Sequence, residues 1–521
     1  MTKRLFSLLT LAATVSPFIS AQSDSKVDYA DRQYLGNIQA GSSNPSALHF
    51  MPITDLADIH VEYRHTGGKF HLIDEGNRLN SWIASFSGMK RIDKVTFAGS
   101  LVYDNTSESE RSWNNTLFVS DRNPFIIGDS LKSKFSTETF HLDGSAAYRP
   151  SENLLLGLGA VYNVGSSATQ KDPRPEIKGM RFRLTPGVEY SFGVHTLGLS
   201  GDVEWLSEEV QHTVVRTTTK QYVFLFQGLG VFEAKDAIGY RRKYNGTHWG
   251  AQVQYAINPT QEAKVSNFIQ VAYFGEYEDA VDGSGNSRYK GGRYSGSGFS
   301  ISERFRLRVS PYTVHNFSLE ADMADSKGKW YTQRSQTDAD GNLIYEVINE
   351  SDNFTGNFSS ATLRYDFNRL NEGGIPLWQA RAAAGINQSV SKNKLYAAKE
   401  SYTNFTCSAG ATKRFPIKKG WLAANIDAAF MMNLEKSLKI SEMPETYSKI
   451  MALYTRPAYN AASTGYWQAG LGLTYSLPVR ILGYASLLEI SAEGDFRNAT
   501  KKVNLLGSDR FYAGGKVGFI F

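Results

Sequence analysis

The sequence of 521 residues contains a single cysteine, Cys407. One thiol cannot form an intrachain disulfide, and it cannot supply the several ligands of a cysteine-based metal site. After the N-terminal region, no stretch reaches the run of about 18 apolar residues that a membrane-spanning helix needs. The net charge of +5 is small for this length, so we expect no nucleic-acid partner. No fixed-length repeat is present, which argues against a propeller or a solenoid.

The N-terminus has the pattern of a secretory signal. Lys3 and Arg4 precede an apolar run from Leu5 to Val15, and a site of small residues ends at Ala21. Because the apolar run is too short to span a membrane, we predict that residues 1–21 form a signal peptide that is cleaved near Ala21.

Apolar and polar residues alternate along many later segments. In one of them, the apolar face holds Leu197, Leu199, Val203 and Trp205, and the polar face holds Ser200, Asp202 and Glu204. The same pattern recurs at 249–257 and 467–477. A period of two is typical of β-strands that separate two different environments. The chain is also rich in Tyr (28) and Phe (30), which favour strands and membrane-interface belts.

The connections between these segments alternate in length. Short turns are expected at Lys90–Asp93, Arg149–Asn153, Asn258–Gln261 and Ile417–Gly420, and long polar connections near Asn105–Lys134, Ser207–Asn245, Asp325–Asn353 and Asn433–Ser463. Bacterial outer-membrane barrels have short periplasmic turns and long extracellular loops. We therefore predict an all-β, antiparallel up-and-down transmembrane β-barrel of about eighteen strands, within about two, over residues 56–521.

The last stretch, Arg510–Phe521, alternates in the same way and ends on an aromatic residue. It resembles the closing strand of outer-membrane β-barrels, in which a terminal Phe helps the insertion machinery to recognise the protein. The resemblance implies an insertion signal at Phe519 and Phe521. It also implies a bacterial outer-membrane location, with membrane lipid, lipopolysaccharide and the barrel-insertion machinery as partners.

Charged residues on the polar faces are the candidates for lining the barrel lumen. They are Arg181, Arg183, Asp202, Glu204, Arg304, Arg306, Arg308, Glu320, Asp322, Arg381, Glu489 and Glu493. One interpretation is a charged pore wall in which basic and acidic rows tune selectivity. The other is a set of cross-strand ion pairs that stabilise the interior. Barrels of about 16 to 18 strands leave an aqueous channel unless something fills it.

The polar region of residues 22–55 is expected to form a periplasmic segment before the first strand. Its stretch Asn44-Pro45-Ser46-Ala47-Leu48 is similar to the lead-in of long-chain fatty-acid transporters and related barrels for hydrophobic substrates. In that family the N-terminal segment forms a small hatch inside the barrel. The resemblance therefore implies a hatch that includes Asn44 and Pro45, while a simple proline turn is the alternative.

The predicted function is an outer-membrane channel, passive or hatch-gated, for small solutes. Transport of a hydrophobic substrate, a surface binding or adhesion scaffold, and a lipid-directed enzyme are the alternatives. Catalysis would require Ser, His and an orienting group near one another, but His60, His141 and His195 lie on separate segments. We therefore expect a protein that is not an enzyme and that has no cofactor and no metal.

Overall fold

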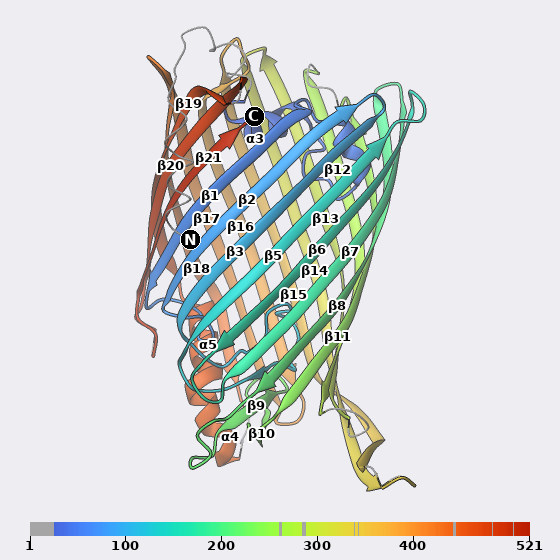
Figure 1. Cartoon of the computed structure of the whole chain (residues 1–521), viewed down its shortest axis with the longest axis vertical. Coiled ribbons are helices and arrows are strands. Elements are labelled where there is room, and N and C mark those ends of the chain that lie inside the picture. Colours follow the sequence, from blue (N-terminus) through green and yellow to red (C-terminus); the bar gives the residue numbers. More distant parts are fainter. Residues whose placement is uncertain are drawn as a thin grey trace.

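The computed structural model describes residues 26–259, 263–283, 288–337, 339–341, 343–440, 444–481, 483–503 and 505–521 (Figure 1). The predicted signal peptide lies outside these residues. The barrel strands are β1 (Asp55–Gly68), β2 (Arg78–Ile92), β3 (Val95–Arg111), β5 (Ser133–Tyr148), β6 (Leu154–Thr169), β7 (Pro175–Phe192), β8 (His195–His212), β11 (Arg241–Ile257), β12 (Val265–Asp282), β13 (Tyr289–Ser310), β14 (Thr313–Thr337), β15 (Leu343–Leu370), β16 (Pro376–Asn393), β17 (Ala398–Ile417), β18 (Gly420–Lys439), β19 (Tyr466–Ile481), β20 (Tyr484–Ala499) and β21 (Asp509–Ile520).

These eighteen strands form a single closed antiparallel sheet. Each strand pairs with its neighbours along the chain, and β21 closes the barrel by pairing with β1, where Phe519 lies opposite Ile59 and Val517 opposite Val61. The predicted fold class and strand number are confirmed. Closure satisfies the backbone groups of both edge strands, which is what a sheet needs in order to cross a membrane.

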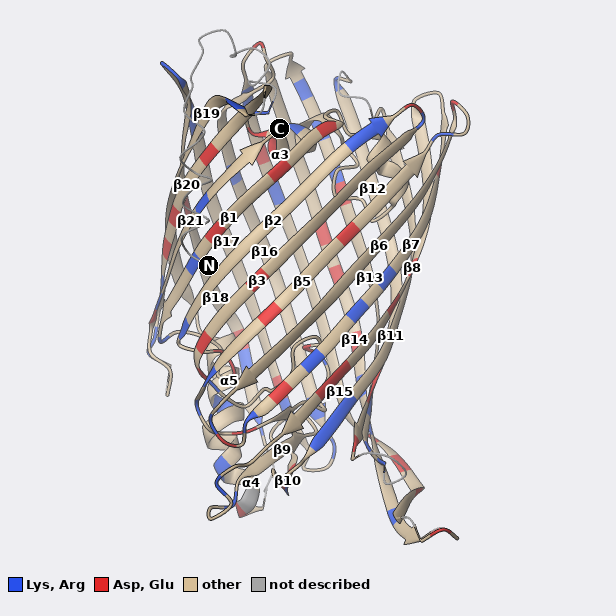
Figure 2. Ribbon diagram, viewed as in Figure 1, with Lys and Arg blue, Asp and Glu red and all other residues tan. Residues whose placement is uncertain are grey.

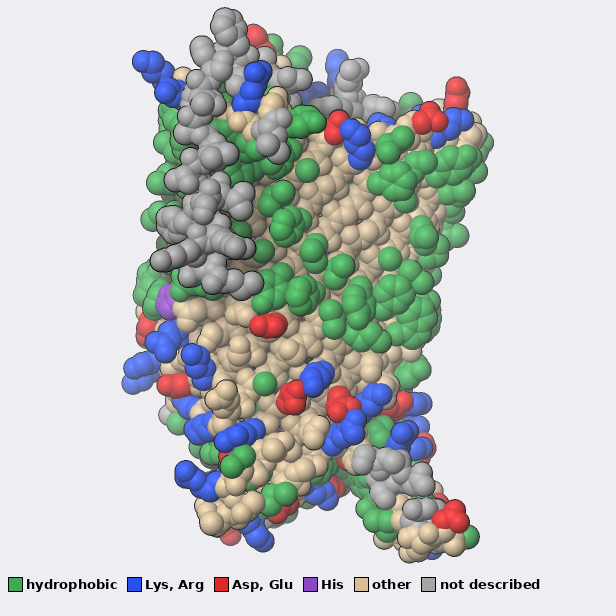
Figure 3. Space-filling view, viewed as in Figure 1, with side chains coloured by type: hydrophobic (Ala, Val, Ile, Leu, Met, Phe, Trp, Pro, Cys, Tyr) green, Lys and Arg blue, Asp and Glu red, His purple; other side chains and the backbone are tan. Residues whose placement is uncertain are grey.

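The outward face of the barrel is apolar. Trp82, Leu158, Val253 and Leu471 are all more than half exposed. Val253 and Leu471 lie on the apolar faces that the sequence predicts. Figure 3 shows apolar side chains spread over the upper and middle part of one outer face, with charged side chains gathered below them and at the upper rim. An apolar band between charged rims is typical of outer-membrane barrels, so the barrel is of the transmembrane type.

The two ends of the barrel differ. One end, the short-turn end, carries tight connections such as 93–94, 193–194 and 418–419, and it includes the predicted short turns at Lys90–Asp93, Arg149–Asn153 and Ile417–Gly420. The predicted turn Asn258–Gln261 lies partly outside the described residues. The other, the long-loop end, carries the connections 112–132, 213–240 and 440–465, which correspond to three of the four predicted long loops.

The prediction of a fourth long loop at Asp325–Asn353 is wrong. β14 and β15 continue through most of it and pair from Thr313–Arg369 to Thr337–Leu343, so that a long hairpin projects from the barrel (Figure 1, yellow). Cross-strand ion pairs join the projecting part, Lys329 with Glu350 at 2.7 Å and Arg334 with Glu346 at 2.9 Å. The alternation of apolar residues marks where the strands leave the membrane, not where they end.

Shorter elements occupy the two ends. At the short-turn end lie α3 (Tyr29–Gly36) and the 3-10 helix η1 (Pro45–Phe50). The long-loop end holds α4 (Glu445–Ile450), the π-helix η2 (Met451–Thr455), α5 (Arg456–Ala462), and a small sheet of β4 (Ile127–Gly128), β9 (Tyr222–Phe226) and β10 (Phe232–Asp236). Among the described residues, no helix is long and apolar enough to cross a membrane.

Candidate functional site

The candidate site is the barrel lumen, and its short-turn end is occupied by the chain's own N-terminal segment. We call residues 26–54 the plug segment. Leu35 of this segment packs with Val314 and Leu370 of the wall, and Ile38 packs with Ala256 and Phe268. Val27 packs with Leu487 and Ile520 of the wall in a third cluster. Each of the three apolar contacts is small, and polar contacts add to them.

Two of the predicted lumenal arginines bind the plug segment. Arg306, which is completely buried, donates from Nη1 to the carbonyl of Leu35 at 2.8 Å and from Nη2 to Ser266 Oγ at 2.9 Å. Since Leu35 lies in the last turn of α3, this guanidinium satisfies a free carbonyl and complements the negative end of the helix. Arg304 donates to the carbonyl of Ile38 at 3.1 Å and lies 4.2 Å from the centre of the Tyr34 ring.

Arg414 on β17 makes a second attachment. Its Nη2 lies 2.6 Å from Asp28 Oδ2 and 3.5 Å from Asp31 Oδ2, and Gln379 donates to Asp31 at 2.7 Å. Burial, reinforced by the neighbouring Asp31 carboxylate, raises the pKa of Asp28 well above its usual range, against the opposing effect of Arg414. Arg414 of β17 therefore holds the plug segment through its carboxylates. Arg306 of β13 holds it through the last turn of α3.

The predicted hatch residues, Asn44 and Pro45, lie against glycines of the wall. Asn44 Oδ1 accepts from the backbone N–H of Ser46 at 3.1 Å, which caps η1, and its Nδ2 donates to the carbonyl of Val188 at 3.1 Å. A Cβ at Gly187 would lie 2.0 Å from Asn44 Oδ1, and a Cβ at Gly157 would lie 2.2 Å from the Ser46 nitrogen. Only glycine allows the plug segment to approach the wall this closely.

His49, near the end of η1, is a titratable group of the plug segment. Its Nδ1 is buried without a hydrogen-bond partner, and its carbonyl accepts from Arg91. Burial, together with the charges of Arg91 and Arg149, lowers the pKa of His49 to about 4. The docked plug segment therefore favours neutral His49.

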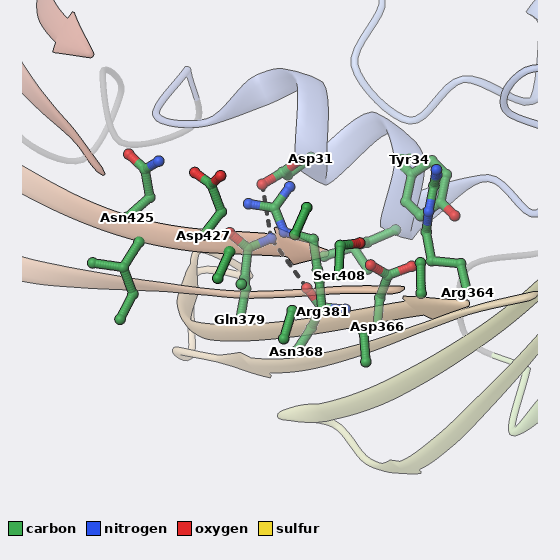
Figure 4. Close-up of a pocket in the computed structure, with 18 residues that line it drawn as sticks. Asp31, Tyr34, Arg364, Asp366, Asn368, Gln379, Arg381, Ser408, Asn425 and Asp427 are labelled. Atoms are coloured by element: carbon green, nitrogen blue, oxygen red, sulfur yellow. Dashed lines mark hydrogen bonds between the residues drawn. The ribbon is translucent and has the colours of Figure 1, made fainter. Parts of the chain in front are cut away.

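Beside α3 the lumen contains a cavity of about 610 Å³. Figure 4 shows Asp31 and Tyr34 of the plug segment on one side and Arg364, Asp366, Arg381 and Asp427 of the wall around it. Arg381, one of the predicted lumenal residues, donates to Thr412 Oγ1 at 3.2 Å. Charged residues of both signs line the cavity together with apolar residues such as Leu35 and Ile426.

The remaining acidic candidates face the lumen at other levels. Glu320 and Asp322 are exposed and lie opposite Ser302 and Ser300 of β13, not opposite the arginines. Glu489 accepts from Ser476 at 3.0 Å and Glu493 from Tyr512 at 2.7 Å. The ion pairs expected between Arg304–Arg308 and Glu320–Asp322 are therefore not formed, because the register offsets the two rows. Arg308 lies at the short turn and donates to the Pro311 carbonyl at 3.3 Å.

Arg181, Arg183 and Glu204 form the predicted cross-strand ion pairs. Glu204 is buried and lies 3.0 Å from Arg181 Nη1 and 2.9 Å from Arg183 Nη2. Asp202 accepts from Gln252 at 2.7 Å. Arg181, Arg183 and Glu204 belong to a network that also includes Glu278, which lies 3.4 Å from Arg181 Nη2.

This network fastens the loop 112–132 inside the lumen. Glu278 accepts from the Ser120 N–H at 3.1 Å and from Asn123 Nδ2 at 2.8 Å, and Glu208 accepts from the Leu117 N–H at 2.9 Å. Figure 2 shows charged residues distributed along the strands and at both ends of the barrel. Both ends of the lumen are thus narrowed by chain that is bound to charged wall residues.

Several residues of this arrangement were not among the sequence candidates. Asp28, Asp31, Gln379 and Arg414 join segments more than 340 positions apart, and no local pattern pairs them. The glycines on the wall were visible only as small residues within alternating segments. Arg414 and Gln379 had a usable signal, because Arg414 shares the polar face of β17 and Gln379 shares the face of β16 that carries Arg381.

A family model matches residues 45–521, which is nearly the whole barrel together with η1. The chain belongs to the family of unknown function DUF6850. No curated protein matches this DUF6850 chain in sequence.

Solved barrels resemble the DUF6850 chain only distantly. The RagAB peptide transporter has a TM-score of 0.40 and 7% identity, with 89% of this chain and 86% of that chain covered. BauA, the ferric preacinetobactin receptor of Acinetobacter baumannii, has a TM-score of 0.39 and 9% identity over 90% and 80% of the two chains. A FadL homologue of Pseudomonas aeruginosa has a TM-score of 0.29 and 11% identity over 92% of each.

Proposed function

We propose that this DUF6850 chain is an outer-membrane channel for small polar solutes and that the plug segment is its hatch. The observation that supports this most is the attachment of the plug segment by Arg304 and Arg306, which bind carbonyls of α3 and the turn after it. When the plug segment leaves, water in the lumen can replace the contacts between these charged groups and backbone carbonyls. Breaking them therefore costs less free energy than separating a broad apolar interface would. The hatch would open by displacement of α3 from the wall.

The charge of the lumen supports a polar solute. The cavity beside α3 is lined in part by acidic residues and by arginines, and Glu320 and Asp322 of β14 are exposed. A substrate without polar groups would leave these charges desolvated and unpaired, which is costly. A hydrated solute that exchanges hydrogen bonds with them avoids that cost. The alternative of a hydrophobic-substrate transporter receives no comparable support.

Conductance in planar bilayers tests the proposal. We expect the wild-type protein to conduct little and the double variant R304A/R306A to open more often, because both changes remove attachments of the hatch and leave the outer face of the barrel unchanged. R497A is the matched control, since Arg497 also faces the lumen but contacts Gln468 at 2.8 Å, away from the plug segment.

Two conductance results would contradict a hatch formed by the plug segment. An R304A/R306A protein that migrates on heat-modifiable gels as a folded barrel and still conducts like the wild type would contradict the proposal. An equal increase in R497A would also contradict it, because the effect would then come from any loss of lumenal charge.

A further inference from the structure

A second cavity, of about 650 Å³, lies at the long-loop end of the lumen, beneath the helices of the loop 440–465. Its walls come from the loops 69–77, 112–132 and 213–240, from η2 and α5, and from strands β15, β16 and β17. Cavities of this size hold small organic molecules. It is distinct from the cavity beside the plug segment, with which it shares no lining residue.

Aromatic rings form one side of this cavity. Phe226, Phe354, Tyr402, Tyr454 and Tyr459 line it. The Tyr454 ring centre lies 4.9 Å from that of Phe226 and 5.4 Å from that of Trp113, which holds the ring in place. Tyr454 lies on the π-helix η2, a form of helix that is rare and is frequent at functional sites.

The charged groups of the cavity are mainly acidic. Its lining holds five carboxylates, those of Asp74, Glu75, Glu108, Asp121 and Glu400, and two arginines, Arg111 and Arg122. Arg111 is engaged by Glu108 at 3.5 Å and by the carbonyl of Asn114 at 2.9 Å. Arg122 lies over the rings of Phe274 and Phe358. Glu400, in contrast, has neither a hydrogen-bond nor an ion-pair partner among the residues that the structure describes.

A second group in the cavity is left without a partner. The side-chain hydroxyl of Thr455 is buried, the residue being 6% exposed, and its Oγ1 has no hydrogen-bond partner in the structure. An unpaired buried hydroxyl costs free energy unless something else satisfies it. Thr455 follows Tyr454 directly on η2 and lines the same cavity as Glu400. A bound molecule would supply the missing partner for both.

We propose that this cavity is a binding site for an organic cation, a small molecule with an ammonium group on an aromatic or aliphatic body. Glu400 pairs with the ammonium group, the rings of Tyr402, Tyr454 and Tyr459 surround it and the adjoining body, and Thr455 Oγ1 accepts one of its N–H groups. Carboxylates and aromatic faces both attract ammonium groups, more strongly where water is scarce. The inference goes beyond the proposed channel, because binding at this cavity requires no conduction.

Isothermal titration calorimetry on the full-length protein in detergent tests the site, with 2-phenylethylammonium as the probe. 2-Phenylethanol and 3-phenylpropionate serve as neutral and anionic analogues of similar shape. We expect the cation to bind about tenfold or more tightly than the alcohol, and the anion to bind least, because only the cation can pair with Glu400. The variant E400Q, which keeps the shape of the side chain, should weaken binding of the cation by about the same factor.

Two further variants separate binding from folding. T455V removes the hydroxyl at nearly constant volume, so it should weaken binding while leaving the thermal midpoint unchanged or higher, since no hydrogen bond of the free protein is lost. E445Q, at an exposed carboxylate of the same loop, should leave binding unchanged.

The site would be overturned if 2-phenylethylammonium gave no binding heat at about 10 mM, a concentration that detects even a very weak complex. Equal binding of the cation and 3-phenylpropionate, or undiminished binding of the cation to folded E400Q, would overturn it as well. A loss of binding in E445Q equal to that in E400Q would place the cation on the loop surface and not in the cavity.

Discussion

At the scale of single residues, the two arginines that are completely buried in the described part of the chain, Arg242 and Arg306, are stabilised in different ways. Arg242 forms a two-point pair with Asp282, at 2.7 and 2.8 Å, so its charge is compensated within the wall. Arg306 has the carbonyl of Leu35 and the hydroxyl of Ser266. A buried charge is tolerated only when such partners replace its water. Because Leu35 belongs to the plug segment, one partner of Arg306 leaves when that segment moves.

Docking of the plug segment should respond to pH through His49 and Asp28. As the pH falls, His49 should weaken docking and Asp28 should strengthen it. The docked pKa of His49, about 4, is below its usual value of 6.5, so docking is strongest above the usual value and weakens as the pH falls toward 4. The docked pKa of Asp28 is raised, so its contribution is greatest at low pH and is lost as the pH rises through that pKa. We expect H49Q to remove the loosening in acid and D28N to make it steeper.

Hydrogen–deuterium exchange of residues 29–50, corrected for the intrinsic effect of pH on exchange rates, measures this response. From about pH 7 to about pH 5, D28N should lose more protection than the wild type, and H49Q should lose less. If H49Q and the wild type lose protection in parallel, His49 does not control docking. Exchange in the hairpin of β14 and β15, far from the plug segment, provides the internal reference.

Residue roles could be predicted only where the partners are close in sequence. Arg183 and Glu204 lie on strands joined by a short turn, so the sequence was enough to place them on one face and within reach, and the structure pairs them. Arg304 and Arg306 were correctly placed on one polar face, but their partners are backbone carbonyls more than 260 positions away. A carbonyl is present at every residue, so it leaves no mark in the sequence.

At the scale of elements, alternation predicted strands reliably only inside the membrane. The outer halves of β14 and β15 expose polar side chains on both faces, and their pattern resembles that of a loop. Their backbone ladder and the pairs Lys329–Glu350 and Arg334–Glu346 nevertheless keep them paired. Outside the membrane, cross-strand hydrogen bonds and side-chain pairs maintain these strands, and an apolar period is not required.

Two glycines on adjoining strands provide a matched test of how the plug segment fits the wall. Gly157 on β6 faces the plug segment, where a Cβ would lie 2.2 Å from the Ser46 nitrogen, whereas a Cβ at Gly144 on β5 would meet nothing within 4 Å. We expect G157A to displace η1 and to reduce the exchange protection of residues 44–50 by about ten- to hundredfold. This factor corresponds to the free-energy cost of overpacking, which is about 1–3 kcal/mol.

G144A should leave that protection unchanged, because its added methyl group points away from the plug segment. Both variants should still migrate as heat-modifiable barrels, since alanine is at least as compatible with a strand as glycine is. Equal protection of residues 44–50 in the two variants would mean that η1 does not depend on this close approach.

At the scale of the whole molecule, local sequence determines the barrel wall, whereas contacts between distant segments determine what lies inside it. The wall follows from local alternation and from turns between consecutive strands, which is why the closed sheet of eighteen strands could be predicted. The plug segment, the loop 112–132 and the two cavities depend on contacts between distant segments. The sequence therefore predicted a charged lumen and, through a resemblance, an N-terminal hatch, but not the contacts that hold the hatch or the loop 112–132.

The difference between the two ends also predicts how the whole molecule lies in the membrane. The projecting hairpin of β14 and β15 carries polar side chains on both faces and cannot lie in lipid, so it must extend into water on the side of the long loops. Outer-membrane barrels place their long loops outside the cell and their short turns in the periplasm. An epitope inserted after Gly341 should therefore bind antibody on intact cells, and one inserted after Val194, in a short turn, should bind only after the cells are made permeable. The reverse labelling would invert the barrel and place the plug segment at the cell surface, where it could not close the periplasmic end of the lumen.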